Sequence, residues 1–447
     1  MYSGRGQEPY DPILLLQMVL YQFLKGRLSP ASWEEEAKLN EAMQWLGHGY
    51  TPARRTWYDF RDRIGDVIER LHDDVTQRAI EQGHVDTTTA ALDGTSIAAC
   101  ASRHRMVNRN TLQRRQELLK ELIDGTYCRT DPLPKWVPPT ESGRQDLASR
   151  IEAAAIVLEQ RINENAKKPS DKRKDPDKIT VSLTDPIAPL GRDKRKTYRP
   201  LYTVQFMVDP VSRLIVSYLC QASATDAGTL APMIDKTQKL FGGQLKRVLA
   251  DGGYCSILDL TDARDRNIDL LAPPSASGSA AKRKSRSGEI QIPREEFRFQ
   301  ASSNCYECPQ GHRLAYLWRE KKMRMGDRYV YQSTYQCDAK FCEGCPLAER
   351  CLSGKGPRRI KRIEGEEMLE AQREKMASES CKTLYRLRGQ TVELSFGDAK
   401  GNRRVDRFHG RGIKRARCET GLLVLAQNLL RLDKLQQRAI SLGKQTA

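Results

Sequence analysis

Two apolar segments that alternate with polar residues around a tight turn constrain this fold more than any other feature. Residues 201–208 and 214–219 are rich in β-branched and aromatic side chains, and Asp209-Pro210 lies between them. This pattern predicts a β-hairpin. Strand-like and helical segments follow one another around it, with strands predicted at 87–92, 245–249 and 268–271 and helices at 227–241 and 256–267. This mixture predicts an α/β fold built on a mixed sheet.

Three acidic residues belong to these predicted elements. Asp93 follows the first strand, and Asp93-Gly94 is expected to form a turn there. Asp251 follows the strand at 245–249, and Glu393 falls in a helix predicted over 388–400. Because ligands of open α/β sheets gather beyond strand ends, we expect the three carboxylates to converge, which is the RNase H-like layout. Oxygen-only ligands of this kind bind Mg²⁺ or Mn²⁺ and suit phosphodiester chemistry.

The charge of the chain is strongly positive and unevenly distributed. Its 447 residues include 75 Lys and Arg against 57 Asp and Glu, a formal net charge of +18. Residues 1–92 instead carry 10 basic and 14 acidic side chains. The remaining excess of basic residues favours a nucleic-acid partner, with binding that weakens as salt rises. Solvated surface charge is the alternative, but such charge usually mixes both signs.

The N-terminal segment, residues 10–82, has the apolar spacing of a small helical bundle. One interpretation is a helix-turn-helix DNA reader that uses Arg54, Arg55, Arg61 and Arg63. The net acidity of the segment favours a dimerisation or scaffold role instead. Both interpretations remain open from the sequence.

The sequence shows neither a membrane span nor a secretion signal, which favours a cytosolic protein. No apolar run approaches the roughly 18–20 residues that a membrane span needs. The N-terminus also lacks a basic segment followed by an apolar one. We therefore expect a cytoplasmic, nucleoid-associated protein without a membrane anchor, whose 12 cysteines are reduced.

A Cys-rich segment gives a second site. Six of the 12 cysteines fall in one stretch, as Cys305-x2-Cys308, Cys337-x4-Cys342-x2-Cys345 and Cys351, with His312 nearby. They flank strands predicted at 314–318 and 329–335, a zinc-ribbon signature. A structural Zn²⁺ takes four ligands, so the spacing leaves open which four bind it. Reduced thiols without metal are the alternative.

Two stretches read as linkers. Residues 275–298 are low in complexity and basic, and they are expected to be flexible. Residues 166–200 are basic and contain proline, and they are expected to be mobile when no DNA is present. The sequence predicts a helical domain over 1–85, the first part of the core over 86–272 with an insertion at 100–200, a flexible linker over 273–300, a zinc-ribbon-like insertion over 301–356, the last part of the core over 357–435 and a tail over 436–447.

Several of these motifs together resemble bacterial insertion-sequence transposases of the DDE type. They are Asp93-Gly-Thr, Tyr202-Thr-Val-Gln, Ala250-Asp-Gly-Gly-Tyr254, Cys342-x2-Cys-Pro-Leu-x3-Cys351 and Tyr385-x2-Arg388-x4-Glu393-x6-Lys400. The resemblance implies an enzyme that cuts DNA at the ends of its own mobile element and joins those ends to target DNA. It also implies that Asp93, Asp251 and Glu393 bind two divalent ions, Mg²⁺ or Mn²⁺.

The same resemblance implies DNA contacts and a ligand set for zinc. Tyr385, Arg388 and Lys400 are expected to contact DNA, and the basic stretch that follows adds four candidates: Arg403, Arg404, Arg411 and Lys414. The family pattern of the Cys block matches Cys308, Cys342, Cys345 and Cys351, which leaves Cys305 and Cys337 as extras. A homodimer is expected.

Helix geometry gives a finer expectation for the signature residues. Lys400 is seven residues from Glu393, so on one helix it would share the face of Glu393. Arg388 would lie about 140° away and contact a neighbouring strand or the flank of the site. A DNA-binding protein that no longer cuts and a simple metal-dependent nuclease are the alternatives; the three intact acids oppose the first, and the helical N-terminus opposes the second.

Overall fold

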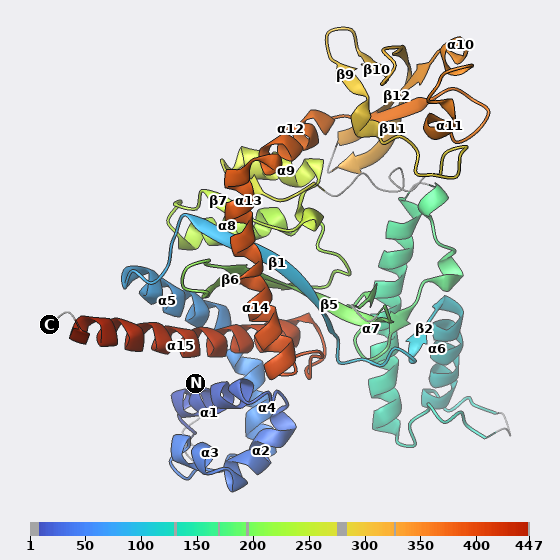
Figure 1. The fold of residues 1–447 in the computed structure, drawn as a ribbon. Helices are drawn as coiled ribbons and strands as arrows, with labels where there is room; N and C mark the ends of the chain where they lie inside the picture. The colour runs from blue at the N-terminus through green and yellow to red at the C-terminus, as the bar shows by residue number, and fades with distance from the viewer. Residues whose placement is uncertain are drawn as a thin grey trace. The chain divides into compact units, whose positions relative to one another are not determined.

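The structure, a computed structural model, mixes helices and strands in two compact units (Figure 1). It describes residues 9–128, 132–168, 170–193, 196–274, 284–325 and 328–445. The first unit comprises Met1–Val248 and Arg386–Ala447, and the second comprises Leu249–Tyr385. The α/β class predicted from the sequence is therefore confirmed. None of the helices within these ranges has the length and apolarity needed to cross a membrane.

The first unit begins with the helices predicted for its N-terminus. Asp11 and Ser29 cap the first two, each accepting a hydrogen bond from a backbone N–H two residues on. Trp33 and Trp57 form the centre of the bundle, both fully buried, with ring centroids 5.9 Å apart and edge to face. The helices are α1 (Pro12–Leu24), α2 (Pro30–Leu39), α3 (Glu41–Leu46), α4 (Arg54–Ile64) and α5 (Ile68–Glu81).

The sheet of the first unit is built on the predicted hairpin. β5 (Tyr198–Val208) pairs antiparallel with β6 (Ile215–Gln221) on one side and with β1 (Thr89–Ala98) on the other. Residues 201–208 of β5 are buried without interruption, so both faces of this strand are covered. β4 (Leu190–Arg192) pairs with the start of β5, and β7 (Arg247–Leu249) lies next to β1.

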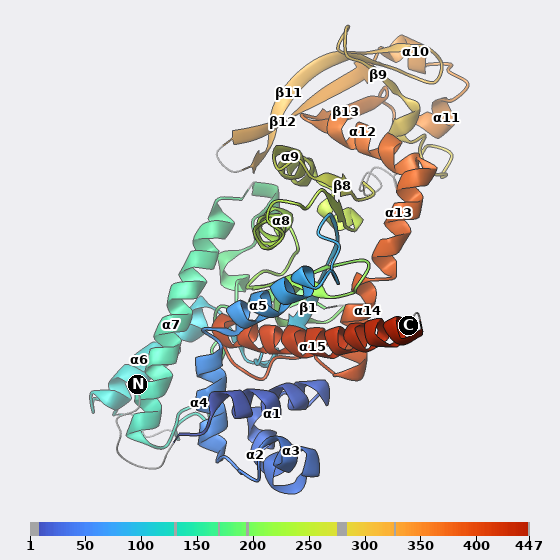
Figure 2. The ribbon, with the colours of Figure 1, turned by 90° about the vertical axis from the view of Figure 1, so that its left-hand side faces the viewer.

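Two helices of the first unit pack against β6. α8 (Leu230–Leu240) is one of them, and the long C-terminal helix α15 (Ile413–Gln445) is the other. α15 also runs beside α5 and α1 (Figure 2). The segment 436–445, predicted as part of a tail, is therefore the end of this helix.

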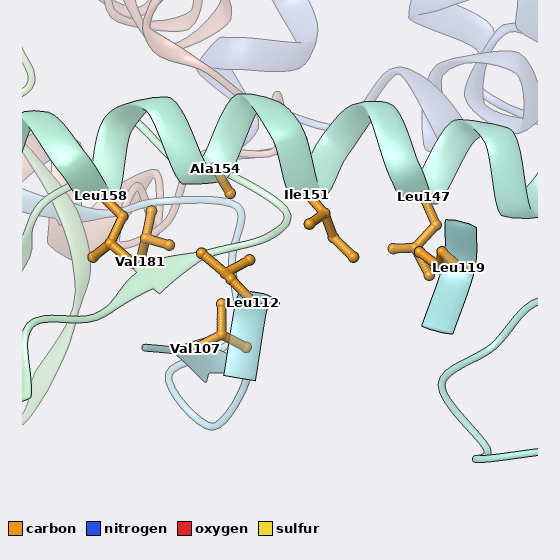
Figure 3. Close-up of a cluster of buried hydrophobic side chains, with 8 residues drawn as sticks. All are labelled: Val107, Leu112, Leu119, Leu147, Ile151, Ala154, Leu158 and Val181. Carbon is orange, nitrogen blue, oxygen red and sulfur yellow. The ribbon is translucent and has the colours of Figure 1, made fainter. Parts of the chain in front are cut away.

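A helical hairpin is inserted between β1 and β5, as predicted. It consists of α6 (Arg109–Ile123) and α7 (Glu141–Ala166), which lie side by side in Figure 1. Leu119 of α6 lies beside Leu147 of α7, and Leu112 of α6 lies opposite Ala154 of α7 (Figure 3). The small strands β2 (Met106–Val107) and β3 (Val181–Ser182) close one end of this apolar cluster.

The segment after α7 differs from the mobile linker that the sequence predicts. The guanidinium of Arg161 donates hydrogen bonds to the carbonyls of Thr180, Pro186, Ile187 and Ala188. Hydrogen bonds from a charged donor are stronger than neutral ones, so these four bonds hold in place the segment between the helical hairpin and β5. Short 3-10 turns, η1 (Ser170–Lys172) and η2 (Pro176–Lys178), complete the described part.

The second unit contains the Cys-rich segment. Its five-stranded antiparallel sheet has the order β13-β12-β11-β10-β9. The bounds are β9 (Arg298–Gln300), β10 (Cys305–Glu307), β11 (Arg313–Met325), β12 (Arg328–Cys337) and β13 (Arg359–Ile363). Its remaining elements are η3 (Gly252–Tyr254), α9 (Ile257–Asp265), β8 (Asp269–Leu271), η5 (Arg294–Glu296), α10 (Ala339–Cys342), α11 (Ala348–Cys351) and α12 (Glu366–Ala377).

The predicted flexible linker is partly ordered. Residues 275–283 lie outside the described residues. In the part from 284 to 300, Ile292 and Phe297 are each 4% exposed and pack into the core of the five-stranded sheet. Composition predicted flexibility there, but two apolar side chains are enough to attach the segment to the sheet.

Candidate catalytic site

Asp93 lies in the middle of β1 rather than at its end. It is opposite Phe206 of β5, and the strand continues through Gly94 to Ala98. The predicted Asp-Gly turn is therefore wrong. Gly94 is needed for a different reason: a Cβ at this position would lie 2.5 Å from Oε1 of Gln205 and 2.7 Å from Oδ1 of Asp226.

Glu393 lies in the first turn of a short helix, α14 (Val392–Gly397). The position of this helix is set by Phe396, whose ring stacks on that of Phe206 with centroids 4.5 Å apart and an interplanar angle of 7°. Val392 is fully buried beside it. The two apolar residues hold α14 on the sheet, and they leave the carboxylate of Glu393 60% exposed.

The side chain of Arg388 connects the two acids. Its Nη2 lies 3.1 Å from Oδ2 of Asp93, and its Nη1 lies 3.5 Å from Oε1 of Glu393. The Arg388 side chain is 11% exposed and that of Asp93 is 18% exposed, so water screens this pair less than a surface pair. Two carboxylates that are 300 positions apart in the sequence thus share one cation.

The single helix expected over residues 388–400 is wrong, although Arg388 does contact a neighbouring strand, through Asp93 of β1. α13 (Glu379–Gly389) ends first, and α14 begins after a break at Gln390 and Thr391. The Thr391 hydroxyl donates to the carbonyls of Leu387 and Arg388, each at 2.9 Å. Side-chain bonds of this kind compete with helix continuation.

Lys400 also leaves the expected helix face. It lies in a π-helical turn, η6 (Asp398–Asn402), which changes the phase of the chain after α14. Its Nζ donates to Oγ1 of Thr95 at 2.6 Å and to the carbonyl of Ser96 at 2.9 Å. Lys400 is therefore attached to β1 two and three residues beyond Asp93, on the same strand.

Asp251 belongs to the second unit. It follows β7 and precedes η3, and its Oδ1 accepts a hydrogen bond from the backbone N–H of Gly253 at 2.7 Å. Its convergence with Asp93 and Glu393 stays a prediction. Among the described residues, no group of three or more His, Cys, Asp or Glu side chains is arranged to hold a metal ion.

The other predicted DNA contacts differ in their surroundings. Arg403 is 6% exposed, and it donates to Asp398 at 2.6 Å and to the carbonyl of Leu24 at 2.8 Å, which favours a structural role. Lys414 is exposed and pairs with Asp66 at 2.8 Å. Arg404 and Arg411 are exposed, whereas Tyr385 is half-buried at the end of the second unit.

The N-terminal arginines were candidates for DNA reading. Arg61 is 3% exposed and donates to Asp62, so its side chain does not face solvent. Arg54, Arg55 and Arg63 are exposed. The helix-turn-helix interpretation therefore loses one of its four contacts.

Four cysteines belong to or pack against the apolar core of the five-stranded sheet, and among the described residues they do not form a metal-binding arrangement. Cys308, Cys342 and Cys351 pack against the apolar cluster that contains buried Cys337. Cys305 is also buried, and its sulfur lies 3.1 Å from the hydroxyl of Ser303. The spacing had left Cys337 among the possible ligands, whereas the family pattern leaves it out.

The chemistry of these thiols suits a soft metal. The sulfur of Cys308 accepts a hydrogen bond from the backbone N–H of His312 at 3.3 Å, a donor that would stabilise a thiolate. Burial raises the pKa of Cys351 to about 11. Burial and then the neighbouring Cys342 raise the pKa of Cys337. Without metal the thiols of Cys337 and Cys351 are therefore protonated at neutral pH, and a bound Zn²⁺ would release their protons.

One feature beside Asp93 was missed in the sequence. Gln205 is fully buried in β5, and its Nε2 donates to Oδ1 of Asp226 at 2.5 Å. This brings a further carboxylate next to Gly94. A polar residue within the otherwise apolar run 201–208 was the available signal, since a buried amide needs a partner.

Two models of known protein families match parts of the chain. A family model described as "Transposase DDE domain" matches residues 307–433, and another, "Transposase domain (DUF772)", matches residues 1–63. No curated protein matches the chain. These two matches indicate an insertion-sequence transposase of the DDE type. The first match includes Arg388, Glu393 and Lys400, whereas Asp93 and Asp251 lie outside both.

Proposed function

We propose that this transposase cleaves the DNA ends of an insertion sequence and joins them to target DNA by two-metal-ion phosphoryl transfer. The observation that carries the proposal is the shared contact of Asp93 and Glu393 with Arg388. A sheet strand and a distant short helix bring two carboxylates to one cation there, in a chain whose family acts on DNA.

The carboxylates of Asp93 and Glu393, with Asp251 as the third acid, would hold Mg²⁺ or Mn²⁺. The guanidinium of Arg388 already satisfies both carboxylates, which indicates that a positive charge is stable between them. Bound divalent ions would activate the attacking water or 3′-hydroxyl and stabilise the leaving oxygen. Lys400, fixed on β1, and Arg388 would orient the phosphates at the acids.

Three further features belong to the proposal. The antiparallel arrangement of β1, β5 and β6, with the first acid on β1, supports an RNase H-like core. The cysteines near Cys337 support one structural Zn²⁺ in the Cys-rich unit. We also propose a homodimer, because joining two element ends needs two active sites in one complex.

An assay with labelled element ends tests the function. Inverted repeats that flank the reading frame would supply the substrate sequence. In Mg²⁺, the purified protein should cut at the repeat ends and produce joined target products. Binding without cutting would indicate a silent DNA-binding protein, and unspecific degradation would indicate a simple nuclease; both outcomes contradict the proposal.

A further inference from the structure

A cleft of about 470 Å³ in the first unit is lined mainly by arginines. Four segments form it: the loop at 100–105 that follows β1, Thr184 after β3, the start of β5, and the loop at 407–411. The cationic side chains among its lining are Arg103, Arg105, Arg199, Arg407 and Arg411, with His104 beside them. Asp93, Glu393 and Arg388 do not line it.

The backbone around the cleft is held in place by several contacts. Ala98 lies at the end of β1. Its N–H donates to the backbone carbonyl of Asp406 at 3.0 Å, and its carbonyl accepts from the backbone N–H of Phe408 at 2.9 Å. The ring of Phe408 is 1% exposed and meets Tyr202 edge to face. Arg407 donates to the carbonyl of Ala101 at 3.2 Å. These contacts position the loop at 407–411 beside the loop that follows β1.

The positive charge of the cleft favours the binding of an anion. Among the described residues that line it, none is acidic. Among them, Arg199 forms an ion pair with a carboxylate outside the cleft lining, that of Asp193, at 2.8 Å. Guanidinium groups brought this close repel one another, so the arrangement is stabilised when an anion joins them. Their planar donors fit phosphate oxygens in pairs, which distinguishes phosphate from smaller anions.

A continuous path along β1 links this cleft to the acids. Asp93, the Lys400 contacts at Thr95 and Ser96, and the cleft beyond Ala98 follow one another along the strand. At about 3.3 Å per residue, the distance from Asp93 to residues 98–100 is about 17–23 Å. A DNA duplex covers that distance in about five to seven base pairs, at roughly 3.4 Å each.

We propose that this cleft binds the phosphate backbone of duplex DNA about five to seven base pairs from the bond that is cut. The proposal rests on the proposed function, because it takes Asp93 and Glu393 as the place of cleavage. The cleft contacts phosphates rather than bases, so it sets the register of the DNA and adds affinity for any sequence.

The salt dependence of DNA binding tests the cleft. The Arg103→Ala/Arg105→Ala double variant should lower the slope of log affinity against log salt by about two units, one per lost phosphate contact. The Arg103→Lys/Arg105→Lys variant keeps both charges and should recover most of the slope. The matched control, Lys434→Ala/Arg438→Ala, removes two exposed cations of α15 and should leave the slope unchanged.

If the Arg103→Ala/Arg105→Ala variant has the same salt slope as the wild type, the proposed role of the cleft in DNA binding is overturned. An equal loss in the α15 control would also overturn it, because net charge alone would then explain the effect. Cleavage of element ends by the wild type is scored separately. Wild-type protein that binds DNA with the predicted slopes but never cuts would refute the proposed function and leave the cleft standing, whereas failure to bind any duplex would refute both.

The distance can be tested on pre-cut element ends. Two sets of duplexes are used, one that extends from the cut bond into the element and one that extends into the flanking DNA. Each set is shortened stepwise, and the affinity of the wild type and of the double variant is measured at every length. On the side that the cleft holds, the affinity difference between wild type and Arg103→Ala/Arg105→Ala should vanish once fewer than about five base pairs remain. A difference that persists on both shortest duplexes would overturn the placement.

Discussion

At the scale of single residues, Lys400 shows how the site is fixed. Its ammonium group has two acceptors on β1, the buried hydroxyl of Thr95 and the carbonyl of Ser96. Thr95 is 4% exposed, so removal of its hydroxyl leaves a charged donor with one partner fewer in a protected place. Hydrogen bonds to charged groups stabilise a folded protein by about 1.5–3 kcal/mol.

Thr95→Val should therefore lower the free energy of unfolding by about 1–3 kcal/mol, because valine keeps the shape of threonine but loses the oxygen. Urea denaturation measures this. Ser96→Ala is the matched control, since Lys400 uses the Ser96 carbonyl rather than its side chain. Equal stability of Thr95→Val and wild type would show that the contact does not hold Lys400.

Gly94 is a second residue whose neighbours decide its identity. Gly94→Ala should destabilise the protein by about 1–3 kcal/mol, because the added methyl group overlaps Gln205 and Asp226 across the sheet. The matched control is Gly397→Ala in α14, where no atom lies within 4 Å of the added Cβ. Thermal unfolding of both variants checks this, and a higher Tm for Gly94→Ala would contradict the close packing beside Asp93.

At the scale of elements, α15 positions the loop at 407–411 through one buried acid. Glu419 is 4% exposed, and its carboxylate accepts from the backbone N–H groups of His409 at 2.9 Å and Gly410 at 2.5 Å. Burial raises the pKa of Glu419 to about 7, outweighing these hydrogen bonds and the nearby arginines. The carboxyl group is therefore easier to protonate in the folded state than in the unfolded chain, where its pKa is 4.5.

The sign of the pH dependence follows from this difference. A raised pKa in the folded state stabilises the fold fully below about pH 4.5, and this contribution is lost as the pH rises to about 7. The stability of wild type relative to Glu419→Gln should fall by about 2–3 kcal/mol between pH 5 and pH 8. Glu81→Gln, an exposed position on α5, should show no such trend. A relative stability of Glu419→Gln that is independent of pH would contradict the raised pKa.

The Cys-rich element gives the metal prediction. Protein purified without chelator should contain one Zn²⁺ per chain, and Cys345→Ser should lower its Tm without selectively blocking cleavage. Cys305→Ser is the control, since that sulfur contacts Ser303 and the family pattern of ligands leaves Cys305 out. Loss of zinc from Cys337→Ser but not from Cys345→Ser would show that Cys337, rather than Cys345, is the fourth ligand. Wild-type protein without zinc in metal analysis would refute the site.

The elements also show what the sequence could predict. Local signals predicted the β5–β6 hairpin and the α6–α7 insertion correctly, because alternation and helical spacing reflect burial directly. The Asp-Gly pair at 93–94 predicted a turn, but these residues lie inside a strand. The glycine is explained instead by the close approach of Gln205 and Asp226, which no local pattern reveals. The helix over 388–400 failed for a local reason, because the Thr391 hydroxyl bonds back to the carbonyl of Leu387 where α13 ends and a π-turn follows α14.

At the scale of the whole molecule, charge and connectivity agree with a DNA enzyme. The net charge of +18 is concentrated after residue 92, and one basic cleft lies along β1 from the paired acids. The residues of the site come from distant parts of the chain. Motif spacing identified Asp93 and Glu393 separately, whereas their common contact with Arg388 required the fold.

Cleavage of labelled element ends by Glu393→Gln tests the pairing of Asp93 and Glu393 most directly. The amide keeps the shape of the side chain but cannot hold a divalent ion, so cleavage in Mg²⁺ should disappear while DNA affinity stays the same or rises slightly. Asp93→Asn should behave alike, and Glu117→Gln, an exposed acid on α6, should cleave as the wild type does. Full cleavage by purified Glu393→Gln or Asp93→Asn protein would contradict a shared catalytic site.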